Sequence, residues 1–314
     1  MKILLTGISS FTGFWFARKL AEAGHELICP LRGDEIGSPS LRQDRLAKLR
    51  GSVQIISNAP FGSERFLGLA SERTYDLLCH HGAEVRNYRS ADFDVVGALK
   101  SNTLNLPRVI DAINGVPIVL TGSVFEQDEG DGGDFVGAFS PYGLSKGLTW
   151  QYFRHFCKSS GVRLGKFVIP NPFGPFEEPR FTAYIMKTWK EGKVVEVKTP
   201  DYVRDNLPVD LLSDAYCSYV RQIASDQANP NPVAFHPSGY VGTMGELVKL
   251  VSKEVRKRTD WACEFTLTRQ TDFPEPLKRV NRQSIFSASG KWNESIFWDE
   301  YVKYYTENPL SNSE

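Results

Sequence analysis

The chain has 314 residues, of which 41% are hydrophobic and 24% charged, an ordinary balance for a globular protein. Basic and acidic residues number 37 each, so the overall charge gives no reason to expect a nucleic-acid or membrane partner. No apolar run approaches the roughly 18 residues of a membrane span, and the five cysteines lack the spacing of a metal site. We therefore expect a cytoplasmic protein without a metal, in which any anionic ligand is bound by a local site.

The N-terminal half alternates short apolar runs with helical patterns. Strands are predicted at Lys2–Leu5, Glu26–Leu31, Asp76–His80, Pro117–Thr121 and Leu164–Ile169. Helices are predicted between them at Phe14–Ala23, Ser101–Ile113 and Pro141–Ser159. Strands that alternate with helices favour an α/β fold with a parallel sheet covered on both faces.

The pattern changes after Ile169, where prolines are too dense for a regular element. Further helices are predicted at Phe181–Glu191, Asp210–Ala224 and Met244–Arg258. We assign residues 1–169 to one domain, to which 207–235 returns. Residues 170–206 and 236–314 then form a smaller mixed α/β region.

A glycine-containing loop, Thr6-Gly7-Ile8-Ser9-Ser10-Phe11-Thr12-Gly13, joins the first strand to the first helix. Without a Cβ, glycine lets the backbone turn sharply and approach a pyrophosphate, whose charge is stabilised at the helix N-terminus. Cofactor contacts are predicted from Gly7, Ser9, Ser10, Phe11, Thr12 and Gly13. The loop taken alone also fits a tight turn without a ligand.

The second predicted strand leads to Pro30-Leu31-Arg32. NAD sites usually have an acidic residue here that accepts from the ribose 2′-hydroxyl, whereas a basic residue suits the 2′-phosphate of NADP. Because Arg32 stands where the acid is expected, the sequence slightly favours NADP(H) over NAD(H). Arg32 stacked on adenine or lying in solvent, and Asp34 as a displaced acid, are the alternatives.

The segment Ser140-Pro141-Tyr142-Gly143-Leu144-Ser145-Lys146 is the most informative. Ser140 suits a helix N-cap, and Pro141 suits the first helical position. Tyr142 and Lys146 then lie on one helix face, where the ammonium favours the phenolate of a tyrosine that is otherwise a poor base. Such a pair can move a proton while a nicotinamide cofactor moves a hydride.

Taken in order, these motifs resemble the short-chain dehydrogenase/reductase family, with its TGxxGxxG loop and YxxxK pair. Ser10 replaces the middle glycine of that loop. The resemblance implies a Rossmann-type doubly wound sheet that binds NAD(P)(H). It further implies roles for several residues: Thr121 or Ser123 as the hydroxyl that bonds the reacting oxygen, Asn102 as the active-site asparagine, and His80 and Gly82 in a segment like HxAA beside the cofactor.

The second half resembles the extended branch of this family, which acts mostly on nucleotide-diphosphate sugars. Pro170-Asn171-Pro172-Phe173-Gly174-Pro175 is similar to its NxYGP segment, which implies that Asn171 contacts the sugar diphosphate and Pro170 the cofactor. Arg204, in a segment like RDxxxVxD, would bind phosphate; the alternative is a surface ion pair with Asp205. Val168 replaces an arginine of many relatives, whose contact Arg180, Arg279 or Arg282 would supply.

The reaction type follows from the residues after Thr121. Sugar 4,6-dehydratases of this branch carry Asp-Glu there, and this chain has Gly122-Ser123. We therefore expect a nucleotide-sugar 4-epimerase or 4-ketoreductase, with a dehydratase or a non-catalytic NADP-sensing scaffold as alternatives. Relatives often pair through the two long helices, here Ser101–Ile113 and Pro141–Ser159, which implies a possible homodimer.

Overall fold

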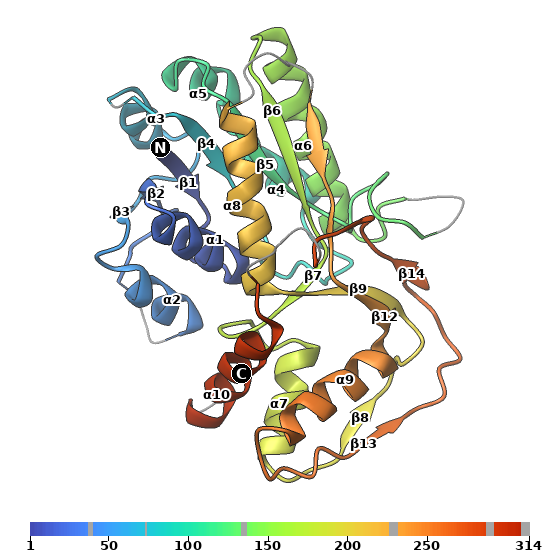
Figure 1. The fold of residues 1–314 in the computed structure, drawn as a ribbon. Coiled ribbons are helices and arrows are strands. Elements are labelled where there is room, and N and C mark those ends of the chain that lie inside the picture. The colour runs from blue at the N-terminus through green and yellow to red at the C-terminus, as the bar shows by residue number, and fades with distance from the viewer. Residues whose placement is uncertain (37–39, 73, 133–136, 226–231, 287–291, 309–314) are drawn as a thin grey trace. The chain divides into compact units, whose positions relative to one another are not determined.

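The computed structural model describes residues 1–36, 40–72, 74–132, 137–225, 232–286 and 292–308 (Figure 1). Contacts between residues divide the chain into two compact units. Unit 1 comprises Met1–Glu129, Val136–Ile169 and Ser213–His236. Unit 2 comprises Gly130–Phe135, Pro170–Leu212 and Pro237–Glu314.

A seven-stranded parallel sheet forms the centre of unit 1. Its strands lie in the order β10 (Val233–Phe235), β6 (Leu164–Ile169), β5 (Ile118–Ser123), β4 (Leu77–His80), β1 (Lys2–Thr6), β2 (Glu26–Pro30) and β3 (Gln54–Ile56). The chain runs outward from β1 to β3 and then returns through β4 to the other half of the sheet. This order confirms the doubly wound, Rossmann-type sheet.

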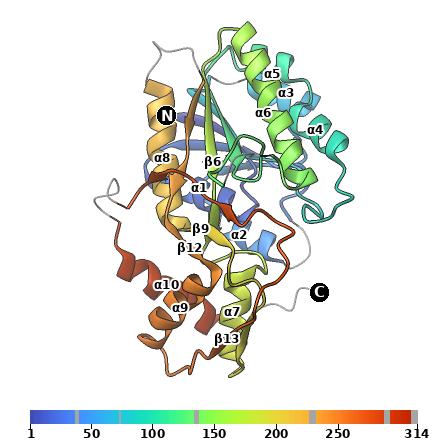
Figure 2. The same ribbon diagram turned by 90° about the vertical axis from the view of Figure 1, so that its right-hand side faces the viewer.

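Helices cover both faces of this sheet, as Figure 2 shows. One face carries α1 (Phe11–Glu22) and α8 (Val209–Ser225), where Phe16 stacks on Tyr216 with 3.9 Å between ring centroids. The other face carries α3 (Glu64–Ser71), α4 (Val95–Thr103), α5 (Leu106–Ala112) and α6 (Pro141–Ser159). A further helix, α2 (Leu41–Leu49), contacts α1. Burial of apolar side chains on both faces stabilises the unit.

The prediction of one helix over Ser101–Ile113 is wrong, because the structure has two helices there, α4 and α5. Asn105 interrupts them with a φ of 50°, and Pro107 in the first turn of α5 lacks the N–H that would continue α4. The break packs against Gly62, whose carbonyl accepts a hydrogen bond of 2.9 Å from the Asn105 side chain. A Cβ on Gly62 would lie 1.8 Å from the Leu104 carbonyl oxygen, so this approach requires glycine.

Unit 2 contains a small sheet around β9 (Val203–Pro208). β12 (Tyr240–Thr243) pairs with β9 in the antiparallel sense, and β7 (Asn171–Phe173) and β14 (Lys278–Arg279) pair with it in parallel. Two strand pairs complete the β-structure: β8 (Val195–Val197) with β13 (Phe265–Leu267), and β11 (Pro237–Ser238) with β15 (Gln283–Ser284). The unit is therefore mixed α/β, as predicted for the C-terminal region.

Three helices pack their apolar faces together in unit 2: α7 (Phe181–Lys190), α9 (Met244–Arg256) and α10 (Glu294–Glu307). Their shared core includes Trp189, Val251, Trp298 and Tyr301. A capping box begins α9, because the Thr243 hydroxyl accepts from the Glu246 N–H while the Glu246 carboxylate accepts from the Thr243 N–H.

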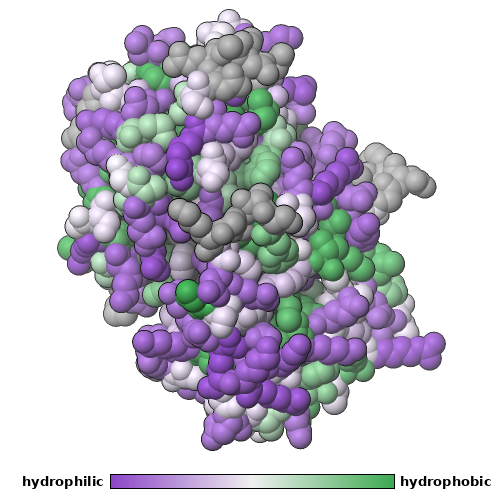
Figure 3. Space-filling model, viewed as in Figure 1, coloured by the Kyte–Doolittle hydropathy of each residue, from purple (hydrophilic) through white to green (hydrophobic). Residues whose placement is uncertain are grey.

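On the face shown in Figure 3, hydrophilic residues are widespread and hydrophobic ones occur in small groups. Within the described ranges, no helix has the length and apolar character that crossing a bilayer requires. The pairing of two copies stays a prediction, which sedimentation velocity would test.

A buried carboxyl lies in unit 2 between β7 and α7. Glu177 is 4% exposed, and its carboxylate accepts hydrogen bonds of 2.7 Å from the hydroxyls of Thr182 and Tyr305. Burial raises the pKa of Glu177 to about 7 despite these bonds. Between about pH 4.5 and pH 7 the folded protein therefore holds a proton on Glu177 that the unfolded chain has lost.

This difference predicts that Glu177 makes the protein progressively less stable as pH rises from about 4.5 through about 7, after which its contribution levels off. The free energy of unfolding of Glu177→Gln, taken relative to that of wild type, should be larger at pH 8 than at pH 5, by an amount on the order of 2 kcal/mol. Urea unfolding at both pH values measures this difference. Glu300→Gln, on the exposed face of α10, is the control. An equal change in both variants would contradict the raised pKa of Glu177.

Candidate active site

The loop between β1 and α1 packs closely against the end of β4. Gly7 has a φ of +82°, and a Cβ on it would lie 2.6 Å from the Gly82 nitrogen. A Cβ on Gly13 would lie 2.1 Å from the Gly7 carbonyl oxygen. Ser10 caps α1, since its hydroxyl accepts from the Gly13 N–H, and the helix begins at Phe11 rather than at the predicted Phe14. The loop is thus a tight turn in which the surrounding protein leaves no room for a side chain at Gly7 or Gly13.

Two consecutive histidines, His80 at the end of β4 and His81 just past it, have different surroundings. His80 is buried, with its Nδ1 2.9 Å from the Thr6 hydroxyl and its Nε2 3.1 Å from the Asn102 carbonyl oxygen. Burial, with the nearby Lys146 ammonium, lowers the pKa of His80 to about 3. His80 is therefore a neutral packing residue that joins β1, β4 and α4.

His81, which the sequence analysis did not select, connects the loop to β5. Its Nε2 lies 3.0 Å from the Ser10 hydroxyl and 3.1 Å from the Thr12 hydroxyl, and its Nδ1 lies 3.0 Å from the Thr121 hydroxyl. Burial, again with Lys146 nearby, lowers the pKa of His81 to about 3. Its position just past the last residue of β4, at the carboxyl edge of the sheet, was the signal that could have identified it.

The helix α6 lies close to the loop that follows β5. A Cβ on Gly143 would lie 2.0 Å from the Phe125 carbonyl oxygen, and one on Gly147 would lie 2.3 Å from the Gln127 side chain. The Ser140 hydroxyl accepts from the Gly143 N–H, as expected of an N-cap. These two glycines allow α6 to approach the end of β5.

Lys146 extends from α6 to β5. Its ammonium donates a hydrogen bond of 2.5 Å to the Thr121 carbonyl, and the residue is 5% exposed. Burial lowers the pKa of Lys146 to about 8; the Glu126 carboxylate opposes this shift and the Lys166 ammonium adds to it. Tyr142, one helical turn earlier, lies among the rings of Tyr88, Phe93 and Phe125.

The three other predicted catalytic residues also lie in unit 1. The Thr121 side chain is buried against His81, and the Ser123 hydroxyl accepts a hydrogen bond of 3.2 Å from the Phe125 N–H. Asn102 accepts from the Glu84 N–H at 2.8 Å and donates to the Thr149 hydroxyl at 3.4 Å. The structure brings the backbone of Thr121 to Lys146, and Asn102 links α4, α6 and the segment after β4.

Arg32 follows β2 and is half exposed. Its guanidinium forms an ion pair with the Glu84 carboxylate and a hydrogen bond of 3.3 Å to the Ala83 carbonyl. The Asp34 carboxylate instead accepts from the Asn58 side chain. An acidic residue is therefore present beside Arg32, although it comes from the segment after β4 and not from β2.

The predicted substrate residues lie in unit 2. Asn171 on β7 donates a hydrogen bond of 2.6 Å to Asn206 on β9, and Pro170, just before it, is buried. Arg180 precedes α7, and Arg279 on β14 is 2% exposed.

Arg204 and Asp205 do not form the surface ion pair considered as an alternative. Arg204, 9% exposed, donates to the carbonyls of Val203, Pro276 and Leu277 and forms an ion pair of 2.8 Å with Glu275. Asp205 accepts from the backbone N–H groups of Gly239 and Asn281, at 2.7 and 3.1 Å. Because alternate residues of a strand point to opposite sides, neighbours on β9 do not meet.

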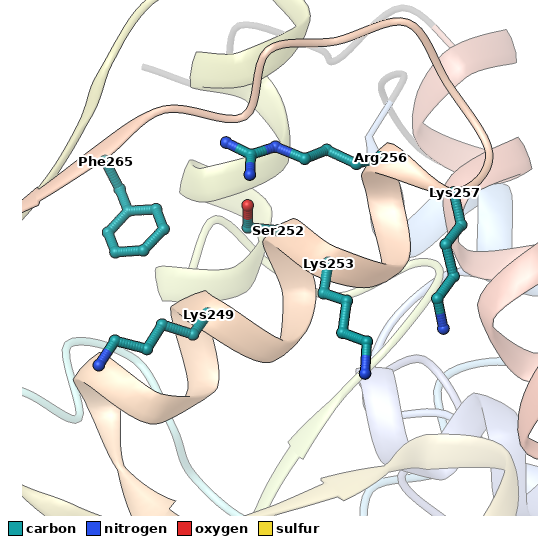
Figure 4. Close-up of a pocket in the computed structure, with 6 residues that line it drawn as sticks. All are labelled: Lys249, Ser252, Lys253, Arg256, Lys257 and Phe265. Atoms are coloured by element: carbon teal, nitrogen blue, oxygen red, sulfur yellow. The ribbon is translucent and has the colours of Figure 1, made fainter.

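Unit 2 also has a pocket of about 450 Å³ along α9, lined by Lys249, Ser252, Lys253, Arg256, Lys257 and Phe265 (Figure 4). Arg256 extends over Ser252, and its guanidinium donates to the carbonyls of Ala262 and Cys263. None of the predicted site residues lines this pocket, and no carboxylate or imidazole in its lining could act as a base. Within the described part of the chain, no group of three His, Cys, Asp or Glu side chains could hold a metal ion.

Comparison with solved structures finds the same fold over nearly the whole chain. UDP-glucose 4-epimerase from Thermotoga maritima, solved with UDP-glucose, is 19% identical, with a TM-score of 0.72 over 98% of this chain and 99% of that one. UDP-glucose 4-epimerase from Stenotrophomonas maltophila, with NAD and formylated UDP-arabinopyranose, is 16% identical, with a TM-score of 0.75 and 98% of each chain covered. dTDP-glucose 4,6-dehydratase from Bacillus anthracis, with NAD, is 16% identical, with a TM-score of 0.72 over 98% of this chain and 97% of that one.

No curated protein matches the sequence. Among protein families, the NAD dependent epimerase/dehydratase family matches residues 3–231, which include the glycine loop, the Tyr142–Lys146 helix and Arg204. The chain therefore belongs to the NAD-dependent epimerase/dehydratase family, a group of NAD-dependent enzymes of the extended short-chain dehydrogenase type.

Proposed function

We propose that the protein is an NAD(P)-dependent 4-epimerase or 4-ketoreductase of a nucleotide-diphosphate sugar, with Tyr142 as the acid and base. The observation that carries the proposal is the buried Lys146 ammonium, held by the Thr121 carbonyl one helical turn from Tyr142. A fixed positive charge near a phenol favours the phenolate. Unit 1 would bind the cofactor and unit 2 the sugar nucleotide.

The tight turn at Gly7 and Gly13 leads into the N-terminus of α1, and this arrangement suits a dinucleotide, because free backbone N–H groups at a helix N-terminus stabilise a pyrophosphate. The loop Gly7–Gly13 would hold the pyrophosphate, Lys146 the nicotinamide ribose, and Arg32 the adenosine ribose. When bound, the nicotinamide supplies hydride transfer to or from the sugar carbon. Tyr142 would take the proton of the sugar hydroxyl during oxidation and return a proton to the oxygen during reduction.

Gly122 supports an epimerase or reductase over a dehydratase. A Cβ there would lie 2.7 Å from Lys166 Cε and 3.0 Å from the Glu126 carboxylate, so the aspartate of the dehydratases has no space. An assay separates the candidates: UDP-, CDP-, GDP- and dTDP-hexoses are offered with NAD⁺, the corresponding nucleotide 4-keto sugars are offered with NADPH, and products are identified by NMR. An epimer formed without net change in absorbance at 340 nm indicates an epimerase, and stoichiometric loss of NADPH indicates a reductase. Cofactor binding without any product would favour the sensing scaffold.

The Tyr142 assignment predicts that Tyr142→Phe lowers turnover by a factor on the order of 10² or more and leaves cofactor affinity nearly intact. Lys146→Ala should lower both, since the ammonium has two roles. Steady-state kinetics and calorimetry with the cofactor measure these effects. Tyr88→Phe, which changes a ring neighbour of Tyr142, is the matched control. Wild-type turnover in Tyr142→Phe would exclude Tyr142 as the acid and base.

Substitutions of Arg32 and of Glu84 should change the cofactor preference in opposite directions. We propose that wild type prefers NADP(H), because the guanidinium can bind the 2′-phosphate once Glu84 releases it. Arg32→Ala should weaken NADPH binding by roughly 1.5–3 kcal/mol, and Glu84→Gln should strengthen it. Fluorescence titration with NADPH and NADH measures both constants. Tighter binding of NADH than NADPH by wild type would refute the preference for NADP(H).

Arg204 is proposed to bind the sugar diphosphate in exchange for its contact with Glu275. Arg204→Ala should then weaken binding of the nucleotide diphosphate by about 1.5–3 kcal/mol and leave cofactor binding unchanged. Glu275→Gln should strengthen diphosphate binding, because it removes the competing carboxylate. Calorimetry with UDP, CDP, GDP and dTDP tests both variants. Unchanged affinities in both would place the diphosphate at Asn171, Arg180 or Arg279.

A further inference from the structure

Four ionisable side chains of unit 1 form a chain of contacts beside the candidate catalytic helix. The Lys166 ammonium on β6 lies 2.7 Å from the Glu126 carboxylate and 2.5 Å from that of Glu129. The other Glu129 oxygen lies 2.7 Å from His236 Nε2. The side chains of Lys166 and Glu126 are 3% and 0% exposed. We call these four residues the Glu126 cluster.

Such a cluster needs an explanation beyond stability. Removing charges from water is costly, and apolar residues of similar volume often replace a buried ion pair without loss of stability. Lys166 is held from several sides: its ammonium also lies over the Trp150 ring of α6, 5.0 Å from the centroid. Although burial raises the pKa of Glu129, the hydrogen bond from His236 and the contact with Lys166 lower it overall. Glu129 therefore retains its negative charge.

The cluster contacts the end of β5 at two successive residues. The Glu126 carboxylate accepts a hydrogen bond of 2.7 Å from the Ser123 N–H. At Gly122, the Lys166 and Glu126 side chains occupy the space that a Cβ would need. The preceding residue, Thr121, is the one whose carbonyl holds the Lys146 ammonium. Three consecutive backbone positions are thus fixed, two by the cluster and one by Lys146.

The charges around Lys146 come from several elements. Lys166 of β6 repels its ammonium, and Glu126 from the loop after β5 attracts it. His80 at the end of β4 and His81 just past it are neutral near pH 7, because burial keeps their pKa at about 3. Tyr142 stands on the same helix as Lys146. Glu126 is therefore the anion that offsets the repulsion between the two buried ammonium groups.

We propose that Glu126 is a positioning residue of this enzyme: held by Lys166, its carboxylate fixes the end of β5 and keeps Lys146 cationic. The effect on turnover rests on the proposed function, but the effect on Lys146 does not require a sugar substrate. Without Glu126, the repulsion from Lys166 would act on Lys146 without an opposing charge, in a region poorly screened by water. Lys146 would then lose its proton at a lower pH.

Glu126→Gln removes the charge with little change in size. Calorimetry with NAD⁺ alone, on protein freed of retained cofactor, gives the affinity from pH 6 to pH 10. Since Lys146 would bind as a cation, affinity should fall as pH rises, and the variant's midpoint should lie lower by on the order of one pH unit. Above both midpoints, the variant should bind NAD⁺ roughly tenfold more weakly than wild type.

Lys166→Gln should shift the pH midpoint of NAD⁺ binding in the opposite direction. Its amide can still donate to Glu126, but the repelling charge is gone, so the midpoint should move to higher pH. It also serves as the test if Glu126→Gln does not fold. Asp214→Asn, which removes a carboxylate from the partly exposed pair with Lys19 in unit 1, should leave the midpoint unchanged.

Midpoints that stay at the wild-type value in the folded cluster variants would overturn the proposal, because a purely structural role lowers stability without this shift. Opposite shifts in the two variants support it, even if no nucleotide sugar is turned over. The same variants in the turnover assay then show whether the alkaline limb of kcat/KM moves with the binding midpoint. The failure of the positioning role and the failure of the proposed reaction are thus distinguishable.

Discussion

The hydrogen bond from the Lys146 ammonium to the Thr121 carbonyl joins the longest helix of unit 1 to the centre of its sheet. It forms only because α6 lies close to the loop after β5, and that approach requires Gly143 and Gly147. The position of Tyr142 depends on the same packing, since a rigid helix carries both side chains. A larger residue at either glycine would therefore move both members of the pair together.

Electrostatics around this contact are controlled by burial. An imidazole buried beside an ammonium loses its proton, which explains why His80 and His81 are neutral and available for hydrogen bonds. His81 uses both ring nitrogens to connect the glycine loop with β5. The glycine loop and the candidate catalytic strand are thus parts of one hydrogen-bonded system within unit 1.

Unit 2 uses its polar residues differently. Arg204 and Asp205 on β9 each satisfy backbone groups of other segments, so they stabilise the small sheet whether or not a ligand binds. In the ion pair between Arg204 and Glu275, the glutamate side chain is half exposed to water. An exposed ion pair is weak, so an anionic ligand can replace the Glu275 carboxylate at Arg204.

The sequence by itself determined features with local causes. The Ser140 cap and Pro141 define the start of α6, and the mostly apolar segment Leu164–Ile169 defines a buried strand. The glycine loop and the YxxxK spacing are local as well, since each lies within a few consecutive residues, and they indicated the family. Short or interrupted elements were missed, such as α2 and the break at Asn105, because their causes are distant contacts like that with Gly62. Only the tertiary structure decided which charges meet: Lys166 and Glu126 lie far apart in the chain, and the order of strands brings them together.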